Sequence, residues 1–115
     1  MAQLNVRERN VNDVTIADLA GKIMIGEGEV QLRETVRHLL QAGKKNILLN
    51  LGDVSFMDSS GVGELVHSYT TTTNQGGKLK LMNLPMKIRD LLTITGLINV
   101  FDAYDSEDEA VRSFN

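Results

Sequence analysis

The chain has 115 residues, the usual length of one domain, and its apolar content of 42% is sufficient for a hydrophobic core without disulfides or metals. It contains no cysteine and only two histidines, which argues against a disulfide framework and a zinc site, and its net charge of −3 argues against nucleic-acid binding. Residues 1–9 lack the apolar stretch of a signal peptide, and no segment approaches the roughly 18 apolar residues of a membrane span. We therefore expect one cytoplasmic domain over residues 1–115 that needs no metal or cofactor and contacts no membrane.

The amino-terminal part of the sequence predicts strands followed by a helix. Apolar and polar residues alternate over residues 4–9 and 14–20, which indicates two strands with one solvated face each. Residues 23–25 indicate a third short strand. A helix is expected to begin near Glu29 and to end before Gly43, with leucine and valine side chains repeating at helical spacing along one face.

The middle of the chain predicts the centre of the sheet. Residues 47–51 form a nearly continuous apolar run of strand length, which is typical of a strand covered on both faces. A second helix follows it, and the four threonines at 70–73 are expected to form its frayed, exposed last turn because β-branched residues are poor helix formers. Residues 78–82 alternate as another strand, in which Lys78 and Lys80 are interpreted as solvated.

The carboxyl-terminal part predicts two further helices around a short strand. Pro85 suits the first turn of a helix that ends near Gly96, and residues 100–101 are interpreted as the last strand. Ser106 and Glu109 match a capping box that opens a terminal helix. Because strands come first and helices and strands then alternate, we expect an α/β fold with a mixed sheet and helices packed mainly on one face.

The junction between the central strand and the second helix carries two adjacent serines, Ser59 and Ser60, directly after Asp58. Backbone N–H groups at a helix start have no partner within the helix, and the helix dipole is positive there, so a hydroxyl or its phosphate ester is well accommodated. Gly61 and Gly63 are expected to let the chain turn closely around the serines. The pattern indicates a switch site, with a helix cap as the alternative because Ser and Asp are favoured N-caps.

Catalytic roles for these serines and glycines are disfavoured. A serine hydrolase needs a base within hydrogen-bond reach of its nucleophile, but His67 lies seven residues beyond Ser60, a rise of about 10 Å along one helix. Gly61 and Gly63 match only the start of a dinucleotide fingerprint, because Val66 stands where the third glycine is needed. We therefore predict no catalytic residues.

Three segments of the chain resemble, in order and spacing, the anti-sigma-factor antagonists of the STAS superfamily. They are residues 51–63, residues 75–81 and residues 91–97, and the first is centred on Phe56-Met57-Asp58-Ser59-Ser60-Gly61-Val62-Gly63. The likeness extends over nearly the whole chain and implies the STAS fold. It also implies that Ser59 is phosphorylated by a partner that is both an anti-sigma factor and a serine protein kinase, with Asp58, Ser60, Gly61 and Gly63 supporting the site.

One position departs from the family pattern. Members commonly carry an acidic residue a few positions after the glycine that ends the second strand, where it helps to build the phosphorylation site, and this chain has Met24 there. Glu27 is the acidic residue that would substitute for it from the nearby turn.

The resemblance implies a bacterial partner-switching regulator of sigma-factor-dependent transcription. In the unmodified state, the surface around Ser59 would bind the kinase and release a sigma factor, phosphorylation would reverse this, and a PP2C-type phosphatase would restore the serine. A phosphoserine adds about −1.5 to −2 charges beside Asp58 and, on this interpretation, near Glu27 and Glu64. The residues expected to contact the partner are Met57, Asp58, Ser59, Val62 and Glu27, and core packing is the alternative role for Met57 and Val62.

A different function is compatible with the same resemblance. The chain would then be a STAS scaffold or the regulatory subunit of a signalling or transporter complex, in which the same surface docks permanently and no phosphorylation occurs. Met24 in place of an acidic residue favours this alternative.

Overall fold

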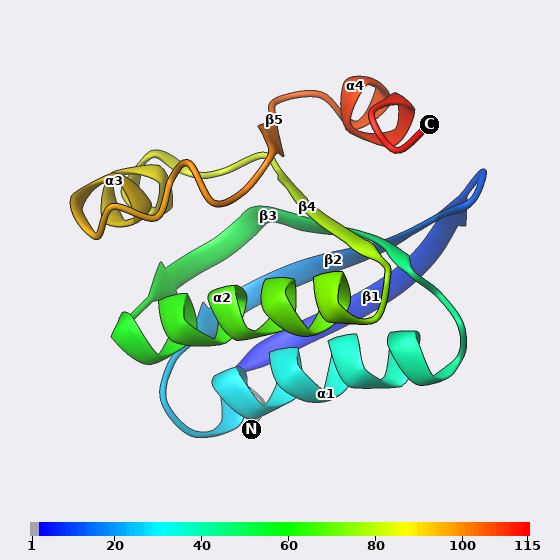
Figure 1. Cartoon of the computed structure of the whole chain (residues 1–115). Helices are drawn as coiled ribbons and strands as arrows, with labels where there is room; N and C mark the ends of the chain where they lie inside the picture. Colours follow the sequence, from blue (N-terminus) through cyan, green and yellow to red (C-terminus); the bar gives the residue numbers. More distant parts are fainter. Residues whose placement is uncertain (1–2) are drawn as a thin grey trace.

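The computed structural model of the protein describes residues 3–115. Its strands and helices alternate after an initial hairpin (Figure 1). In chain order they are β1 (Leu4–Val11), β2 (Val14–Ile23), α1 (Glu27–Gln41), β3 (Asn46–Met57), α2 (Ser59–Asn74), β4 (Lys78–Met82), α3 (Met86–Ile94), β5 (Ala103–Tyr104) and α4 (Glu107–Arg112).

The five strands form one mixed sheet in the order β1-β2-β3-β4-β5. β1 pairs antiparallel with β2, and the remaining neighbours are parallel, as expected when helices connect them. Helices α1 and α2 lie together on one face of the sheet, and α4 lies beyond the other (Figure 1). The predicted α/β fold, with a mixed sheet covered mainly on one face, is confirmed.

The alternation of side chains along β3 explains the two layers. Ile47 and Leu49 are buried in the core that α1 and α2 cover, whereas Leu48 is buried in a smaller cluster with Val111 and Phe114 from the region of α4. Successive strand residues point to opposite faces, so a continuous apolar run needs a cover on both. Among the described residues, no helix is both long and apolar enough to cross a membrane.

The prediction of a separate strand at residues 23–25 is wrong. β2 continues through Gly21 to Ile23, because its register shifts allow Lys22 and Ile23 to remain paired with Phe56 and Met57 of β3. Ile25 lies beyond the strand in the loop before α1 and is exposed. β3 is correspondingly longer than the apolar run that predicted it and reaches Met57.

The threonine run lies at the end of α2, as expected, but it is not frayed and only part of it is exposed. α2 continues to Asn74, and Thr72 is fully buried, with its hydroxyl donating to the carbonyl of Ser68 at 2.8 Å. Because this hydroxyl is hydrogen-bonded within the helix, its burial leaves no polar group unpaired. Packing of α2 against the sheet therefore overrides the low helix propensity of threonine.

Two further expectations for the last third of the chain are corrected. The last strand is Ala103–Tyr104, because Leu81 N–H donates to Asp102 O at 2.9 Å and Asn83 N–H to Tyr104 O at 2.8 Å. Phe101 is used for packing instead, edge-on to Tyr69 at a centroid distance of 5.5 Å. Lys80 is not solvated: its ammonium group donates to Ser113 O at 2.9 Å and lies 4.9 Å from the centre of the Phe114 ring.

Candidate functional site

Asp58 is the single residue between the end of β3 and the start of α2, and it caps the helix. Its backbone is extended, and its Oδ1 accepts a hydrogen bond from Gly61 N–H at 2.9 Å. A carboxylate in this position satisfies an unpaired N–H and lies at the positive end of the helix dipole. The capping role that was one interpretation of the serines therefore belongs to Asp58.

The second carboxylate oxygen of Asp58 reaches a different part of the fold. Oδ2 accepts a hydrogen bond at 3.0 Å from the N–H of Ile25, in the loop between β2 and α1. The bonds from Ile25 and then Gly61 hold the pKa of Asp58 below its ordinary value, because they stabilise the ionised carboxylate. Asp58 thus holds a negative charge beside Ser59 and fixes the loop next to it.

Ser59 begins α2 and is exposed. Two apolar side chains near it, Ile25 in the fold and Phe56 in the sequence, are also exposed. Ile25, tethered to Asp58 through its backbone, is 67% exposed, and Phe56, three residues before Ser59, is 47% exposed. Sequence reasoning missed both. Alternation from the buried Val54 would place Phe56 in the core, but the register shift between Val54 and Phe56 turns Phe56 outward, and sequence periodicity does not reveal such a shift.

The two glycines of the helix start have different surroundings. Gly61 is buried, and a Cβ atom there would lie 2.2 Å from the carbonyl oxygen of Ile23, so only glycine lets α2 approach the end of β2 this closely. Gly63 is exposed, and a Cβ atom there would meet nothing within 4 Å. The close approach expected of both glycines is therefore needed at Gly61 and not at Gly63.

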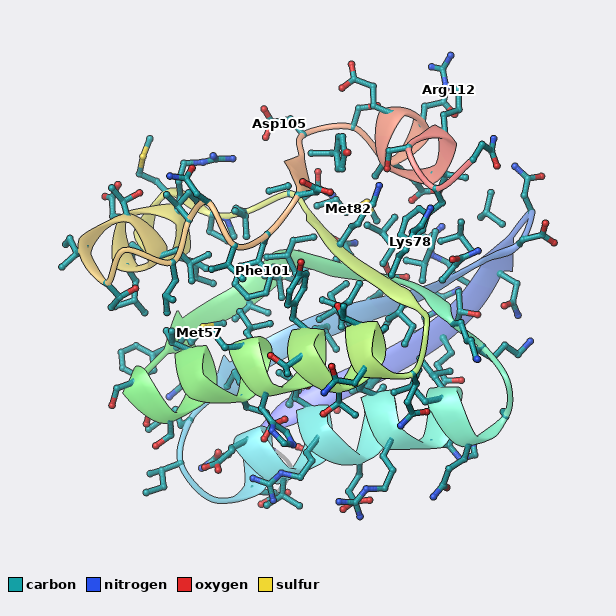
Figure 2. All side chains as sticks on the ribbon, viewed as in Figure 1. Met57, Lys78, Met82, Phe101, Asp105 and Arg112 are labelled. Atoms are coloured by element: carbon teal, nitrogen blue, oxygen red, sulfur yellow. The ribbon has the colours of Figure 1, made fainter. Side chains whose placement is uncertain are left out.

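The remaining residues predicted for the partner surface are dispersed by the fold. Met57 and Val62 are buried in the main core at 6% and 4% exposure, which favours their packing role and leaves little of either side chain for a partner. Figure 2 shows Met57 at the end of β3, between the start of α2 and α3. Glu27 is exposed at the first position of α1, directly after the loop that Asp58 holds, and Met24 in that loop is half-buried.

Glu64 does not face the switch region, contrary to the sequence-based interpretation. Its side chain is 3% exposed, accepts a hydrogen bond from Arg33 Nε at 2.9 Å and another from Ser68 Oγ at 3.1 Å, and so joins α2 to α1. His67 lines the groove between these two helices. The chemistry available at Ser59 is therefore that of an exposed hydroxyl beside a fixed carboxylate. Within residues 3–115, no cluster of metal-ligating side chains is present.

Comparison of the chain with known protein families gives one match over most of its length. The family model of the STAS domain matches residues 5–110. The chain belongs to the STAS domain family.

Several STAS proteins are similar to this chain over almost their whole length. The anti-sigma-B factor antagonist of Bacillus subtilis (strain 168) is 38% identical over 105 residues, which cover 91% of this chain and 94% of that protein. A crystal structure from Thermotoga maritima, described as a candidate anti-sigma factor antagonist, is 26% identical with a TM-score of 0.84, covering 95% and 93% of the two chains. Phosphorylated SpoIIAA from Bacillus shares the fold, with 23% identity, a TM-score of 0.74 and coverage of 96% and 100%.

Proposed function

We propose that this STAS protein is an anti-sigma factor antagonist, which binds an anti-sigma factor and thereby releases a sigma factor. The similarity to the Bacillus subtilis anti-sigma-B factor antagonist supports this class of function. The observation that carries the proposal is the exposed Ser59 at the start of α2, beside the ionised Asp58. On this proposal residues 1–115 act as one cytoplasmic STAS domain that binds and does not catalyse.

Phosphorylation of Ser59 is the proposed switch, and the anti-sigma factor is the proposed serine kinase. Ser59 Oγ would attack the γ-phosphorus of the kinase's ATP, so that the new Oγ–P bond forms, ADP leaves and the hydroxyl proton passes to a base of the kinase. The exposure of Ser59 and the unpaired N–H groups of a helix start favour this modification. A PP2C-type phosphatase would hydrolyse the ester and restore the hydroxyl.

The phosphate would weaken the complex through local charge. It adds about −1.5 to −2 charges next to Asp58, whose hydrogen bonds to Ile25 and Gly61 keep it ionised. The partner surface that we propose includes the exposed side chains of Ile25 and Phe56 in place of the buried Met57 and Val62. When the partner covers these apolar side chains, the phosphate and the Asp58 carboxylate beside them lose hydration without gaining a cationic partner. Binding of the phosphorylated protein is therefore unfavourable.

Two measurements test the proposal. Phosphosite mapping by mass spectrometry on protein from its native cells should find phosphate on Ser59. In binding experiments with the purified anti-sigma factor of the same cells, Ser59→Ala should bind constitutively and Ser59→Asp at least tenfold more weakly. Thr70→Ala, which removes an exposed hydroxyl from α2 far from its first turn, is the matched control and should bind and be phosphorylated like the unchanged protein.

The alternative function gives the opposite pattern. Absence of phosphate from Ser59 under all growth and stress conditions, with equal affinity of Ser59→Ala and Ser59→Asp, would reject the switch. A stable complex of the unmodified protein with a large signalling or transporter assembly would then identify it as a permanently docked STAS subunit.

A further inference from the structure

A second feature next to the switch region is a cleft between the end of β3 and α3, which we call the β3–α3 cleft. Its volume is about 240 Å³. Figure 1 shows α3 beside the carboxyl end of β3, where α2 begins. The side chains that define it are Val54, Phe56 and Met57 from β3 and Lys87, Ile88 and Leu91 from α3.

The lining of the cleft is mainly apolar, with the hydroxyl residue Ser55 and one cation. Val54, Met57 and Ile88 are buried, Leu91 is half-buried, and Phe56 is 47% exposed. Lys87 is exposed and is the one charged side chain among the described residues that line the cleft. An occupant that matches this surface has an apolar group for the interior and a negative group for Lys87.

The size of the cleft selects the kind of occupant. Small-molecule sites usually have volumes of about 300–1,000 Å³, whereas an apolar cavity of about 150 Å³ already holds a benzene ring. A cleft of 240 Å³ therefore suits one large side chain. Buried anchors of this kind, inserted into a pocket on the partner, dominate the energetics of many protein interfaces.

The cleft is continuous with the switch surface. Phe56 belongs both to the cleft and to the exposed apolar pair near Ser59, and Met57 adjoins Asp58 in the chain. We propose that the β3–α3 cleft receives one aliphatic or aromatic side chain of the anti-sigma factor, with a neighbouring carboxylate of that partner paired to Lys87. This inference rests on the proposed function and adds to it a second docking point that phosphorylation does not modify.

The test compares cleft variants with matched surface variants. The probe is the purified anti-sigma factor that binds Ser59→Ala, and affinity is measured by calorimetry. Phe56→Ala and Lys87→Glu should each weaken binding at least fivefold. Ile94→Ala removes an exposed apolar side chain from the same helix outside the cleft, and Lys44→Glu makes the same charge change far from it; both should bind within twofold of the unchanged protein.

Charge reversal on the partner identifies the pairing directly. Acidic residues of the anti-sigma factor are changed to lysine one at a time, and each variant is tested for binding to Lys87→Glu and to the unchanged protein. One such variant should bind Lys87→Glu with restored affinity and bind the unchanged protein more weakly. Thermal unfolding of each variant establishes that it is folded.

The outcomes separate this inference from the proposed function. If Ser59→Asp weakens binding but Lys87→Glu and Phe56→Ala behave like the controls, the cleft is not a docking point and the switch stands. If the unchanged protein and Ser59→Ala bind no anti-sigma factor, both proposals fail. A concentration-dependent dimer, seen by light scattering and lost in Phe56→Ala, would assign the cleft to a second copy of this chain and overturn the inference.

Discussion

Gly61 and Gly63 are two positions apart near the start of α2, yet only Gly61 is enclosed. We expect Gly61→Ala to destabilise the fold by about 3 kcal/mol, because the added Cβ atom would overlap the carbonyl oxygen of Ile23 and displace backbone. Gly63→Ala should stabilise it by about 0.5–1 kcal/mol, since alanine is the better helix former and the site is open. Urea unfolding followed by far-UV circular dichroism measures both changes. Equal free energies of unfolding for the two variants would contradict the packing described here.

The sequence predicts some features of the site around Ser59 and not others. The strand-to-helix junction at Ser59 was predictable, because an apolar run ends and a helical repeat begins within a few residues. The second hydrogen bond of Asp58 was not, because its donor, Ile25, lies 33 residues away and only the pairing of β2 with β3 brings it close. The exposure of Ile25 follows from the end of β2 at Ile23, which leaves Ile25 in a turn where the sequence pattern had predicted a strand.

At the scale of elements, α1 and α2 are joined by an ion pair of which one member is buried. Arg33→Met would leave the carboxylate of Glu64, whose side chain is only 3% exposed, without its charge partner. We expect the free energy of unfolding to fall by about 2 kcal/mol. This is less than the usual cost of breaking a fully buried pair, because Arg33 is partly exposed. Arg37→Met is the matched control on the same helix. Its pair with Glu34 is exposed on both sides, so a change of about 0.3 kcal/mol is expected.

Chemical denaturation of the two variants at neutral pH measures this difference. Replacing Arg33 and Glu64 together by methionine and leucine should recover much of the loss, because no charge then remains buried. A double variant as unstable as Arg33→Met would show that the arginine stabilises α1 through packing alone.

Elements with a clear period were predicted well, and those decided by tertiary contacts were not. β4 has the predicted bounds, and α1 and α3 end just before Gly43 and Gly96 as expected. The order and burial of the threonine run and the position of the last strand were predicted wrongly, because the burial of Thr72 and Phe101 decides them. Phe101 packs on Tyr69 of α2, and the buried face of α2 packs on β4; short-range periodicity reveals neither arrangement.

At the scale of the whole molecule, the sequence did not reveal which contacts hold α4 on the second face of the sheet. Arg9 in β1 pairs with Asp18 of β2 through Nε at 2.7 Å and with Glu107 of α4, 98 residues away in the chain. Asn50 of β3 donates to the same Asp18 at 2.8 Å. One cation thus connects the first strand, the second strand and the terminal helix.

This network predicts how stability depends on pH. The side-chain hydrogen bonds from Arg9 lower the pKa of Asp18 and the pKa of Glu107, so the folded state favours both carboxylates in their ionised form. A lowered folded-state pKa contributes stability that is present above the ordinary pKa of about 4 and is lost as the pH falls through the lowered value. Arg9→Gln should therefore reduce the free energy of unfolding by about 1 kcal/mol at pH 7, with the difference from the unchanged protein shrinking towards pH 3.

Urea unfolding at pH 7, 5 and 3 and constant ionic strength tests this dependence, with Arg112→Gln as the control. The pair of Arg112 with Asp108 lies within α4 at 3.5 Å, with both side chains largely exposed, and Figure 2 shows Arg112 on the outer side of the helix. Its removal should change the free energy of unfolding by less than about 0.5 kcal/mol at every pH. If the Arg9→Gln difference is the same at pH 7 and pH 3, the ionised carboxylates are not what fastens α4. Apolar packing of Val111 and Phe114 on the sheet would then carry that role.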